Sequence, residues 1–416
     1  MEKRFFTIDD IKHVKSKVVL VRVDINCPID PATGRITDDE RIRLHSTATI
    51  AELARKGAKV VVIAHQGRPG DIDFVSLREH AKLVGKYAKS EVRFIDELFS
   101  TRVAGEIKAM KDGEMLLLEN VRFYSEELLE RPADALAKTN MVQAFSAVCD
   151  YFVNDAFAAI HRGQASLVGF GEVLPTVAGR LIEREGFALD KASQDGKKPA
   201  VFVMGGTKVD DSVKAIEHLL AGGKADHVLA GGLLGNFFLM AKGCDIGNKS
   251  AETIRGKGFE KLLPFGKELL EKYKGKIEMP EDVAIMDGER KDIPVSSLPT
   301  SHFIGDIGRK TIERYCGLIR KAKTIVFNSP MGVYERAEFR EGTESMLKAA
   351  AETDAYKVVG GGHTDDMVNR LGLSRKFDHV SSGGRAVLYY LAGKNLPVIE
   401  MLERAKERWK GKLDKV

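Results

Sequence analysis

Short runs of valine, isoleucine and leucine recur along the chain, separated by longer stretches in which apolar residues return at helical spacing. Most of these runs are continuous rather than alternating, which is typical of parallel strands that helices cover on both faces. This rhythm predicts an α/β protein built on parallel sheets. The strands are expected at residues 18–23, 59–64, 115–118, 151–153, 200–204, 227–230, 324–327, 357–359 and 379–380.

The chain has 416 residues, which is enough for two or three domains. A helical pattern over residues 176–192 precedes the polar run SQDGKKP (193–199), and this change indicates a domain boundary. We therefore expect domains at residues 1–177 and 196–395, joined by a helix and linker at residues 178–195. The basic tail from Glu403 to Val416 is expected to form a solvated helix.

Composition narrows the class of protein. Hydrophobic residues make up 44% and charged residues 30% of the chain, with 40 glycines and 12 prolines, which excludes a disordered or fibrous protein. The net charge of +5 is too dilute to argue for a nucleic-acid or membrane partner. Cys27, Cys149, Cys244 and Cys316 form no disulfide or metal-ligand spacing, and no signal peptide is visible, so we expect a cytoplasmic protein in a reducing compartment.

Polar side chains follow the strands of the first half, at the carboxyl ends where open parallel sheets bind their ligands. The segments are VRVDIN (21–26), AHQGRP (64–69), LENVRF (118–123) and VNDAFAAIHR (153–162). One arginine alone is more often a surface residue, but several at successive strand ends indicate a small ligand with more than one negative charge. The candidates for this site are Asp24, Asn26, Arg41, His65, Arg68, Arg122 and Arg162.

Glycine and backbone amides dominate the strand ends of the second half: MGGTK (204–208), AGG (230–232), FNSPMG (327–332), VGGGHT (359–364) and SSGG (381–384). Glycine lets the backbone approach a ligand, and free amides at helix N-termini favour anions, so five such loops suggest a nucleotide. A single glycine pair is more often explained by packing. Neither the P-loop pattern nor the dinucleotide-binding GxGxxG pattern is present, so another nucleotide fold is expected.

Eight motifs in order along the chain resemble those of the phosphoglycerate kinases. VRVDINCPI is similar to the family's RVDFNVP, AHQGRP to SHLGRP, LLENVRF to LLENxRF, and FVNDAFAAIHR to FVNDAFGxAHR. MGGTKV resembles GGAKV, FNSPMGVYE resembles WNGPVGVFE, VVGGGHT resembles the GGGDT loop, and VSSGG resembles STGGGA. The segment DINCPIDPATGRITDDERIRLH is most similar to the archaeal branch of the family.

The resemblance implies two Rossmann-like domains, each a parallel sheet between helices, joined by a hinge helix that closes the molecule over its ligands. It implies that the first domain binds 3-phosphoglycerate or 1,3-bisphosphoglycerate and that the second binds Mg²⁺ with ATP or ADP. The tail at about residues 396–416 would return to the first domain. The implied reaction is reversible phosphoryl transfer between 1,3-bisphosphoglycerate and ADP, which would serve glycolysis and gluconeogenesis. A monomer is the default expectation for the oligomeric state, and a homodimer is the alternative.

Site residues are carried over by motif position. The implied substrate-binding residues are Asp24, Ile25, Asn26, Arg41, His65, Gln66, Gly67, Arg68, Arg122 and Arg162. The implied nucleotide-binding residues are Lys208, Gly231, Gly232, Asn328, Pro330, Glu335, Gly361, Gly362, His363 and Thr364. Phosphoryl transfer from an acyl phosphate needs positioning and charge neutralisation rather than a covalent intermediate, and Arg41 and Lys208 are the candidates for that catalytic role.

Three positions depart from the family pattern. Ser212 stands where the family often has a second lysine, His363 replaces the aspartate of GGGDT, and Arg385 replaces the third glycine of STGGGA. A neutral histidine is a poor ligand for Mg²⁺, which prefers oxygen. No protein ligand of the metal is therefore identified, and nucleotide phosphates and water would mainly hold it. Arg385 either adds positive charge near the transferred group or turns outward.

Two alternatives stay open, and the departures motivate the first of them. One is a non-catalytic relative that retains only the anion site, and the other is a kinase for another small phosphorylated acid.

Overall fold

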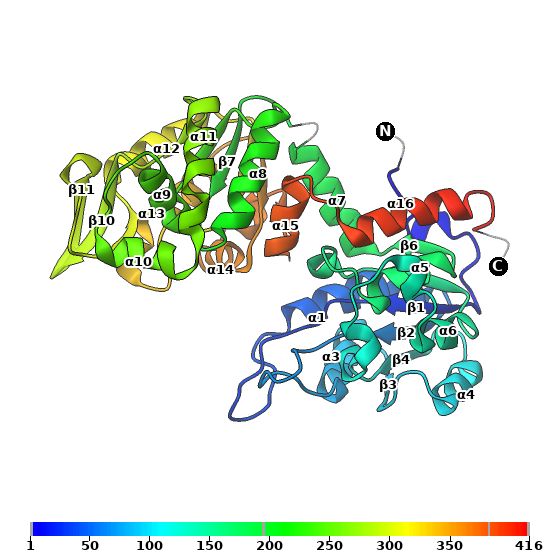
Figure 1. Ribbon diagram of the computed structural model, residues 1–416. Helices are drawn as coiled ribbons and strands as arrows, with labels where there is room; N and C mark the ends of the chain where they lie inside the picture. The colour runs from blue at the N-terminus through cyan, green and yellow to red at the C-terminus, as the bar shows by residue number, and fades with distance from the viewer. Residues whose placement is uncertain (1–2, 194–195, 382, 414–416) are drawn as a thin grey trace. The chain divides into compact units, whose positions relative to one another are not determined.

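The computed structural model describes residues 3–193, 196–381 and 383–413, and the chain divides into two compact units. The first unit comprises Met1–Gly186 and Asn395–Val416, and the second comprises Phe187–Lys394 (Figure 1). Each unit contains a six-stranded parallel sheet with helices against it. The predicted α/β class with two Rossmann-like domains is therefore confirmed.

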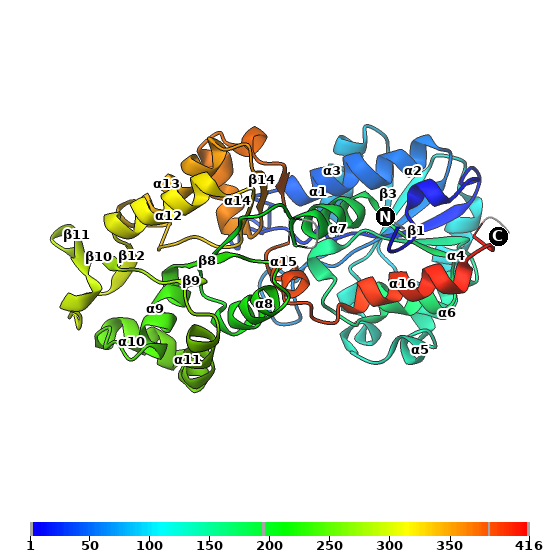
Figure 2. The ribbon, with the colours of Figure 1, turned by 90° about the horizontal axis from the view of Figure 1, so that it is seen from above.

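The first sheet has the strand order β3-β4-β2-β1-β5-β6, with every neighbouring pair parallel. Figure 2 shows α1, α2 and α3 on one face of this sheet and α5, α6 and α16 on the other. The strands are β1 (Val18–Arg22), β2 (Lys59–Ile63), β3 (Val92–Ile95), β4 (Met115–Leu118), β5 (Tyr151–Asn154) and β6 (Thr176–Ala178). The helices are α1 (Glu40–His45), α2 (Ala51–Arg55), α3 (Arg78–Ala88), α4 (Thr101–Ala109), α5 (Ala133–Leu136), α6 (Asn140–Ser146) and α16 (Pro397–Trp409).

The second sheet has the order β15-β14-β13-β7-β8-β9, and a small antiparallel sheet has the order β11-β10-β12. Helices α12, α13 and α14 lie on one face of the large sheet and α8 to α11 on the other (Figure 2). The strands are β7 (Ala200–Met204), β8 (His227–Ala230), β9 (Ile277–Glu278), β10 (Asp282–Asp287), β11 (Glu289–Pro294), β12 (Ile304–Ile307), β13 (Thr324–Phe327), β14 (Tyr356–Val359) and β15 (His379–Val380). The helices are α8 (Val209–Ala221), α9 (Gly232–Ala241), α10 (Asn248–Gly256), α11 (Leu263–Lys272), α12 (Arg309–Lys321), α13 (Glu341–Ala351), α14 (Gly362–Arg370) and α15 (Gly384–Leu391).

Both large sheets reverse their strand order at one point. In the first sheet the chain builds outward from β1 on one side and then crosses to β5 on the other, and in the second sheet β7 and β13 flank the same kind of reversal. Ligands of open α/β sheets bind outside the carboxyl ends of the strands at such points. The residues after β1 and β5, and those after β7 and β13, are therefore the ones that the fold favours for chemistry.

The helical pattern assigned to residues 176–192 is wrong at its start. Thr176–Ala178 forms β6, which pairs with Phe152–Asn154 of β5, and the helix α7 (Arg180–Ser193) begins only after Gly179. Except for β10, whose run VAI is buried in the middle of the small sheet, the other strands that the sequence pattern missed are short, at a sheet edge, or charged: β11, for example, has the sequence ERKDIP and no buried residue. Such strands lack the continuous apolar run that marks a buried one.

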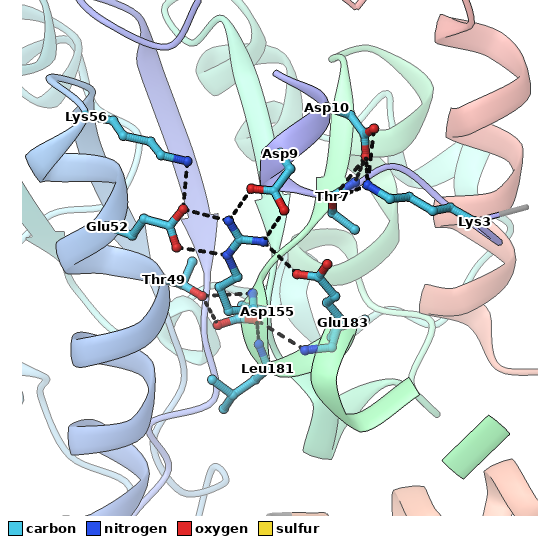
Figure 3. Close-up of polar contacts among 12 residues, drawn as sticks. Lys3, Thr7, Asp9, Asp10, Thr49, Glu52, Lys56, Asp155, Leu181 and Glu183 are labelled. Carbon is cyan, nitrogen blue, oxygen red and sulfur yellow. Dashed lines mark hydrogen bonds and ion pairs between the residues drawn. The ribbon is translucent and has the colours of Figure 1, made fainter. Parts of the chain in front are cut away.

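The start of α7 is held by the buried carboxylate of Asp155, which follows β5. One oxygen accepts hydrogen bonds from the backbone amides of Leu181 (2.7 Å) and Ile182 (3.3 Å), which would otherwise lack partners in the first turn of the helix. The other oxygen accepts from Thr49 Oγ1 at 2.7 Å (Figure 3) and from His45 Nδ1 at 3.2 Å. A carboxylate can be fully buried at this place because it has four donors.

Arg180, the first residue of α7, forms a second cluster beside Asp155. Its guanidinium binds both carboxylate oxygens of Glu52, at 2.7 and 2.8 Å, and it also pairs with Asp9 and Glu183, which converge with Glu52 in Figure 3. The hydrogen bond with Arg180 lowers the pKa of the Glu52 carboxyl to about 2. The cluster therefore ties η1 (Ile8–Asp10), α2 and α7 together.

The tail forms α16 within the first unit, and only one face of it is solvated. Met401, Leu402 and Ala405 are buried, and beyond the helix the carbonyl of Leu413 accepts a hydrogen bond from Tyr151 Oη at 2.9 Å. The expectation of a solvated helix is therefore wrong for the apolar face. Within the described residues, no helix is long and apolar enough to cross a membrane.

Gly179 provides a test of how tightly α7 is anchored. A Cβ atom at this position would lie 2.4 Å from Asp155 Cγ, so Gly179→Ala must displace the carboxylate that caps the helix. We expect a loss of about 2 kcal/mol, which lowers the melting temperature of the first unit by about 4–8 °C. Thermal unfolding followed by circular dichroism measures this shift.

Gly105→Ala is the matched control, because Gly105 is an exposed position in α4 where an added Cβ meets no atom within 4 Å. That variant should be neutral or stabilised by up to about 1 kcal/mol. Equal melting temperatures for the two variants would contradict the proposed anchoring.

Candidate active site

Asp24 and Arg41 form the centre of the site on the first unit. Asp24 follows β1 and is 4% exposed, and its Oδ2 atom lies 3.5 Å from Arg41 Nη1. Burial alone would raise the pKa of the Asp24 carboxyl, but the charges of Arg41 and Arg22 outweigh this and hold the pKa well below its ordinary value. Asp24 is therefore a carboxylate at any physiological pH and accepts hydrogen bonds without donating them.

His65, at the end of β2, has its ring orientation fixed by Arg22. Arg22 Nη2 lies 2.9 Å from His65 Nδ1, and because a guanidinium only donates, Nδ1 must accept. Burial, and then the positive charge of Arg22, lower the pKa of His65 to about 3. The ring is thus neutral, with its proton on Nε2, and offers one N–H donor.

The loops that follow β1, β2 and β4 are joined by hydrogen bonds between candidate residues. Asn26 Oδ1 accepts from the amide of Gly67 at 2.8 Å, and the guanidinium of Arg122 donates to the Gly67 carbonyl. Gln66 is fully buried. Its side-chain oxygen accepts a hydrogen bond from the amide of Cys27, and its side-chain nitrogen donates to the carbonyls of Cys27 and Asp73. These side chains hold the loops in place, which leaves other groups to face a ligand.

The remaining substrate candidates are placed differently. The side chain of Ile25 is completely buried in the hydrophobic core, so only its backbone is at the edge of the sheet. The charge of Arg162 lowers the pKa of both His65 and Arg22, so Arg162 lies close to them. Arg68 is exposed and forms no ion pair with the described residues. The structure thus brings Asp24, Arg41, His65 and Arg162 together at the edge of the first sheet.

Arg22 is a further residue of this site that the sequence pattern did not single out. It is 1% exposed, although it is a charged residue in an otherwise apolar strand. Its Nε atom donates to Ser166 Oγ at 3.0 Å, and Ser166 in turn donates to the buried carboxyl of Glu127 at 2.6 Å. A buried charge inside a strand needs such partners, so the arginine of the segment VVLVR was the available signal.

On the second unit, the glycines pack against neighbouring loops of the protein itself. A Cβ at Gly205 would lie 2.2 Å from the Pro330 carbonyl oxygen, one at Gly231 would lie 2.5 Å from Met331 Sδ, and one at Gly361 would lie 2.7 Å from the Asn328 carbonyl oxygen. The amide of Gly232 also donates to Met331 O at 2.7 Å. Close packing of the loops after β7, β8, β13 and β14 therefore accounts for these glycines without a ligand.

Three polar groups at this edge have no hydrogen-bond or ion-pair partner among the described residues. Asn328 is 3% exposed, and neither its Nδ2 nor its Oδ1 atom has a partner among the described residues. Thr364 is completely buried, and its Oγ1 atom is likewise unpaired there. Lys208 is half-buried and forms no ion pair within the described part of the chain, and burial lowers the pKa of its ammonium group. Unpaired buried polar groups are rare, so water or a ligand is expected to satisfy those of Asn328 and Thr364.

The other nucleotide candidates are less informative. Gly231 and Gly361 are the N-caps of α9 and α14, and Gly232, Gly362 and His363 lie in the first turns of those helices. Pro330 is buried and Glu335 is exposed. Across the described residues, no group of three or more His, Cys, Asp or Glu side chains is arranged to hold a metal ion.

Comparison with known proteins assigns the chain to a class. The model of the family "Phosphoglycerate kinase" matches residues 8–394. A phosphoglycerate kinase of Methanobacterium bryantii is 47% identical over 98% of this chain and 99% of its own length, and one of Methanococcus maripaludis is 44% identical over 98% and 100%. The crystal structure of phosphoglycerate kinase from Pyrococcus horikoshii OT3 superposes with a TM-score of 0.89 at 39% identity, covering 97% of this chain and all of that one.

The fold and these similarities define a phosphotransferase made of two α/β domains. More particularly, the chain belongs to the phosphoglycerate kinase family, and its resemblance to the archaeal members is confirmed. The alternative of a non-catalytic relative has no support from the comparisons.

The buried histidines predict how stability depends on pH. Burial lowers the pKa of His65 to about 3 and that of His80 to about 4, so below about pH 6.5 the unfolded chain binds protons that the folded chain does not. We expect the free energy of unfolding to fall as the pH drops from 6.5 to 4, by at most about 1.4 kcal/mol per pH unit for each histidine. Denaturant titrations at several pH values measure it.

Nuclear magnetic resonance of the folded wild type measures the protonation of His65 separately from that of the other titratable groups. Its ring should remain neutral between pH 5 and 8, with the proton on Nε2. Arg22→Met removes the donor to Nδ1, and the pKa of His65 should then rise toward its ordinary value. A wild-type His65 that titrates near pH 6.5 would disprove the assignment.

Proposed function

We propose that this kinase transfers a phosphoryl group between the acyl phosphate of 1,3-bisphosphoglycerate and ADP, giving 3-phosphoglycerate and ATP, and that the reaction is reversible. The observation that carries the proposal is the convergence of Arg41, Arg162 and the neutral ring of His65 around the buried carboxylate of Asp24. Such a set fits a small ligand that has both anionic groups and a hydroxyl group.

We assign the phosphoglycerate to the first unit. The cationic groups would bind the carboxylate and the phosphate, since guanidinium groups match both. Asp24, which remains ionised, would accept a hydrogen bond from the hydroxyl group, and His65 Nε2 would donate to an anionic oxygen. Asn26, Gln66, Gly67 and Arg122 support the loops from which these groups project.

The nucleotide belongs, in this proposal, to the second unit. Lys208 follows β7 and forms no ion pair with the described residues, and it would bind phosphate oxygens. Asn328 and Thr364 supply hydrogen-bonding groups that have no partner within the described residues, and the first turn of α14 presents its amides at the same edge. Glu335 is exposed after β13 and would accept from ribose hydroxyls.

The protein would promote the reaction by positioning the two substrates and by neutralising the charge of the transferring group. The transferred group passes directly from one oxygen to another, and no covalent intermediate with the protein is needed. Arg41 would neutralise the transferring group from the substrate side and Lys208 from the nucleotide side. Bringing both ligands together and excluding water would protect the acyl phosphate from hydrolysis.

Mg²⁺ enters this proposal as part of the nucleotide substrate. Mg²⁺ prefers oxygen ligands and retains several waters, so phosphates and water would provide most of its coordination. Asp365 is the carboxylate nearest in sequence to the glycine loop at residues 359–364. Its Oδ1 atom accepts a hydrogen bond from Asn369 at 3.0 Å.

The direct test is a coupled assay with 3-phosphoglycerate and Mg-ATP, run on the wild type, Arg41→Ala and Lys208→Ala. Each substitution removes a cation that stabilises the transferred group, so we expect turnover to fall by about 100-fold or more in each. Arg43→Ala is the control, because Arg43 lies on the same helix as Arg41 but is exposed and pairs with Glu40.

Arg43→Ala should keep turnover within about twofold of the wild type. A folded wild type without activity would refute the proposed reaction. Full activity in Lys208→Ala would leave the reaction standing but remove Lys208 from its mechanism.

A further inference from the structure

Arg385 lies at the same edge of the second sheet as the proposed nucleotide groups. It is in the first turn of α15, directly after the edge strand β15, while Lys208 follows β7 and Thr364 follows β14. Since all these strands are parallel, their carboxyl ends meet at one edge. The loop after β14 also packs on α15, because a Cβ at Gly360 would lie 3.0 Å from Val387 Cγ1.

Helices α8 and α15 lie side by side (Figures 1 and 2), and a cluster of charges joins them. Asp211, in the first turn of α8, is 5% exposed, and its Oδ1 atom accepts from Lys394 Nζ at 2.9 Å. Arg385 Nε lies 3.7 Å from Asp211 Oδ2, which is an ion pair but is too long for a hydrogen bond. The charge of Arg385 also lowers the pKa of Lys208, so the two cations are close enough to repel.

The cluster contains more positive charge than its carboxylates balance. Lys208, Arg385 and Lys394 are opposed by Asp211 and by Asp210, which is exposed. Asp211 already has a close partner in Lys394, and the guanidinium of Arg385 forms no hydrogen bond with the described residues. Its donors therefore remain available to an anion.

We propose that Arg385 is a ligand of the terminal phosphates of the bound nucleotide, which it shares with Lys208, and that Asp211 holds the guanidinium near this position when no nucleotide is present. The inference rests on the proposed function, because it names a further residue of the same nucleotide site. Arg385 distinguishes a nucleoside diphosphate or triphosphate from a monophosphate, since only the longer chains extend to the cluster.

Helix α8 itself offers no other cation facing this cluster. Ser212, one turn after Lys208, is 1% exposed and uncharged, and Lys214 is exposed and forms no ion pair with the described residues. A second positive charge beside Lys208 must therefore come from a neighbouring element, and α15 supplies it. An arginine suits this role because its planar fork can bind two phosphate oxygens.

The test measures the affinity of the full chain for AMP, ADP and Mg-ATP by calorimetry. Arg385→Met keeps the aliphatic stem and removes the charge, and it should weaken ADP and Mg-ATP binding by about tenfold or more while AMP binding stays within twofold. Arg375→Met is the matched control. Arg375 is exposed, has no ion pair within the described residues, and precedes β15 at the opposite edge of the sheet, so all three affinities should be unchanged.

A second pair of variants separates a phosphate ligand from a merely structural residue. Asp211→Asn removes the competing carboxylate and should tighten Mg-ATP binding, and this gain should shrink when Arg385→Met is also present. Thermal unfolding confirms that each variant is folded.

Three results overturn the inference. Mg-ATP binding by Arg385→Met within twofold of the wild type, or an equal loss for AMP and ATP, would show that Arg385 does not bind the terminal phosphates. An equal gain from Asp211→Asn with and without Arg385 would show the same. A folded wild type that binds neither ADP nor Mg-ATP would refute the proposed function itself, and this outcome is distinct from the others.

Discussion

The first unit depends on a buried guanidinium. Arg22 occupies the end of β1, where it is 1% exposed, and a charge in such a place is tolerated only if several groups satisfy it. It donates to the Val23 carbonyl, to Ser166 and to His65, so one side chain determines the positions of groups on β1, on β2 and on η6 (Ala165–Gly169). Glu127 completes the set through Ser166, and burial raises the pKa of its carboxyl, which limits how strongly it offsets the cation. The ring of His65 is neutral because it is buried and because this cation lies beside it.

The loops at the carboxyl edges of the two sheets are held in place in different ways. On the first unit, polar side chains bind one another, as Asn26, Gln66 and Arg122 do across three loops. On the second unit, the loops pack closely against one another, and glycine is needed because any larger residue would collide with a neighbouring loop. Rigid loops of either kind reduce the entropy that is lost when a ligand is bound. Within this closely packed edge, the polar groups of Asn328, Thr364 and Lys208 have no partner among the residues that the structure describes.

The amino-acid pattern was sufficient for the class of fold and for the family, because continuous apolar runs and strand-end motifs are local features. It was insufficient for β6 and β11, whose residues are few or charged and which exist only because a neighbouring strand offers hydrogen bonds. Arg22 was overlooked for a similar reason, since only tertiary contacts show that its charge is buried. Likewise, the pattern suggested that glycines cradle a phosphate, whereas a Cβ atom added at Gly205, Gly231 or Gly361 would lie only 2.2–2.7 Å from a neighbouring loop, so close packing alone already requires glycine there.

The hydrogen bond between Tyr151 and Leu413 links residues 262 positions apart and shows how the first unit is completed. The whole second unit, Phe187–Lys394, is inserted between the two segments of the first. Chains are synthesised from the N-terminus, and domains generally fold as units while they emerge. During synthesis the second unit therefore has all its residues while the first still lacks α16, so the domain that starts first is the one that finishes last. Until the ribosome releases the tail, the apolar surface that Met401 and Leu402 will cover remains open to solvent.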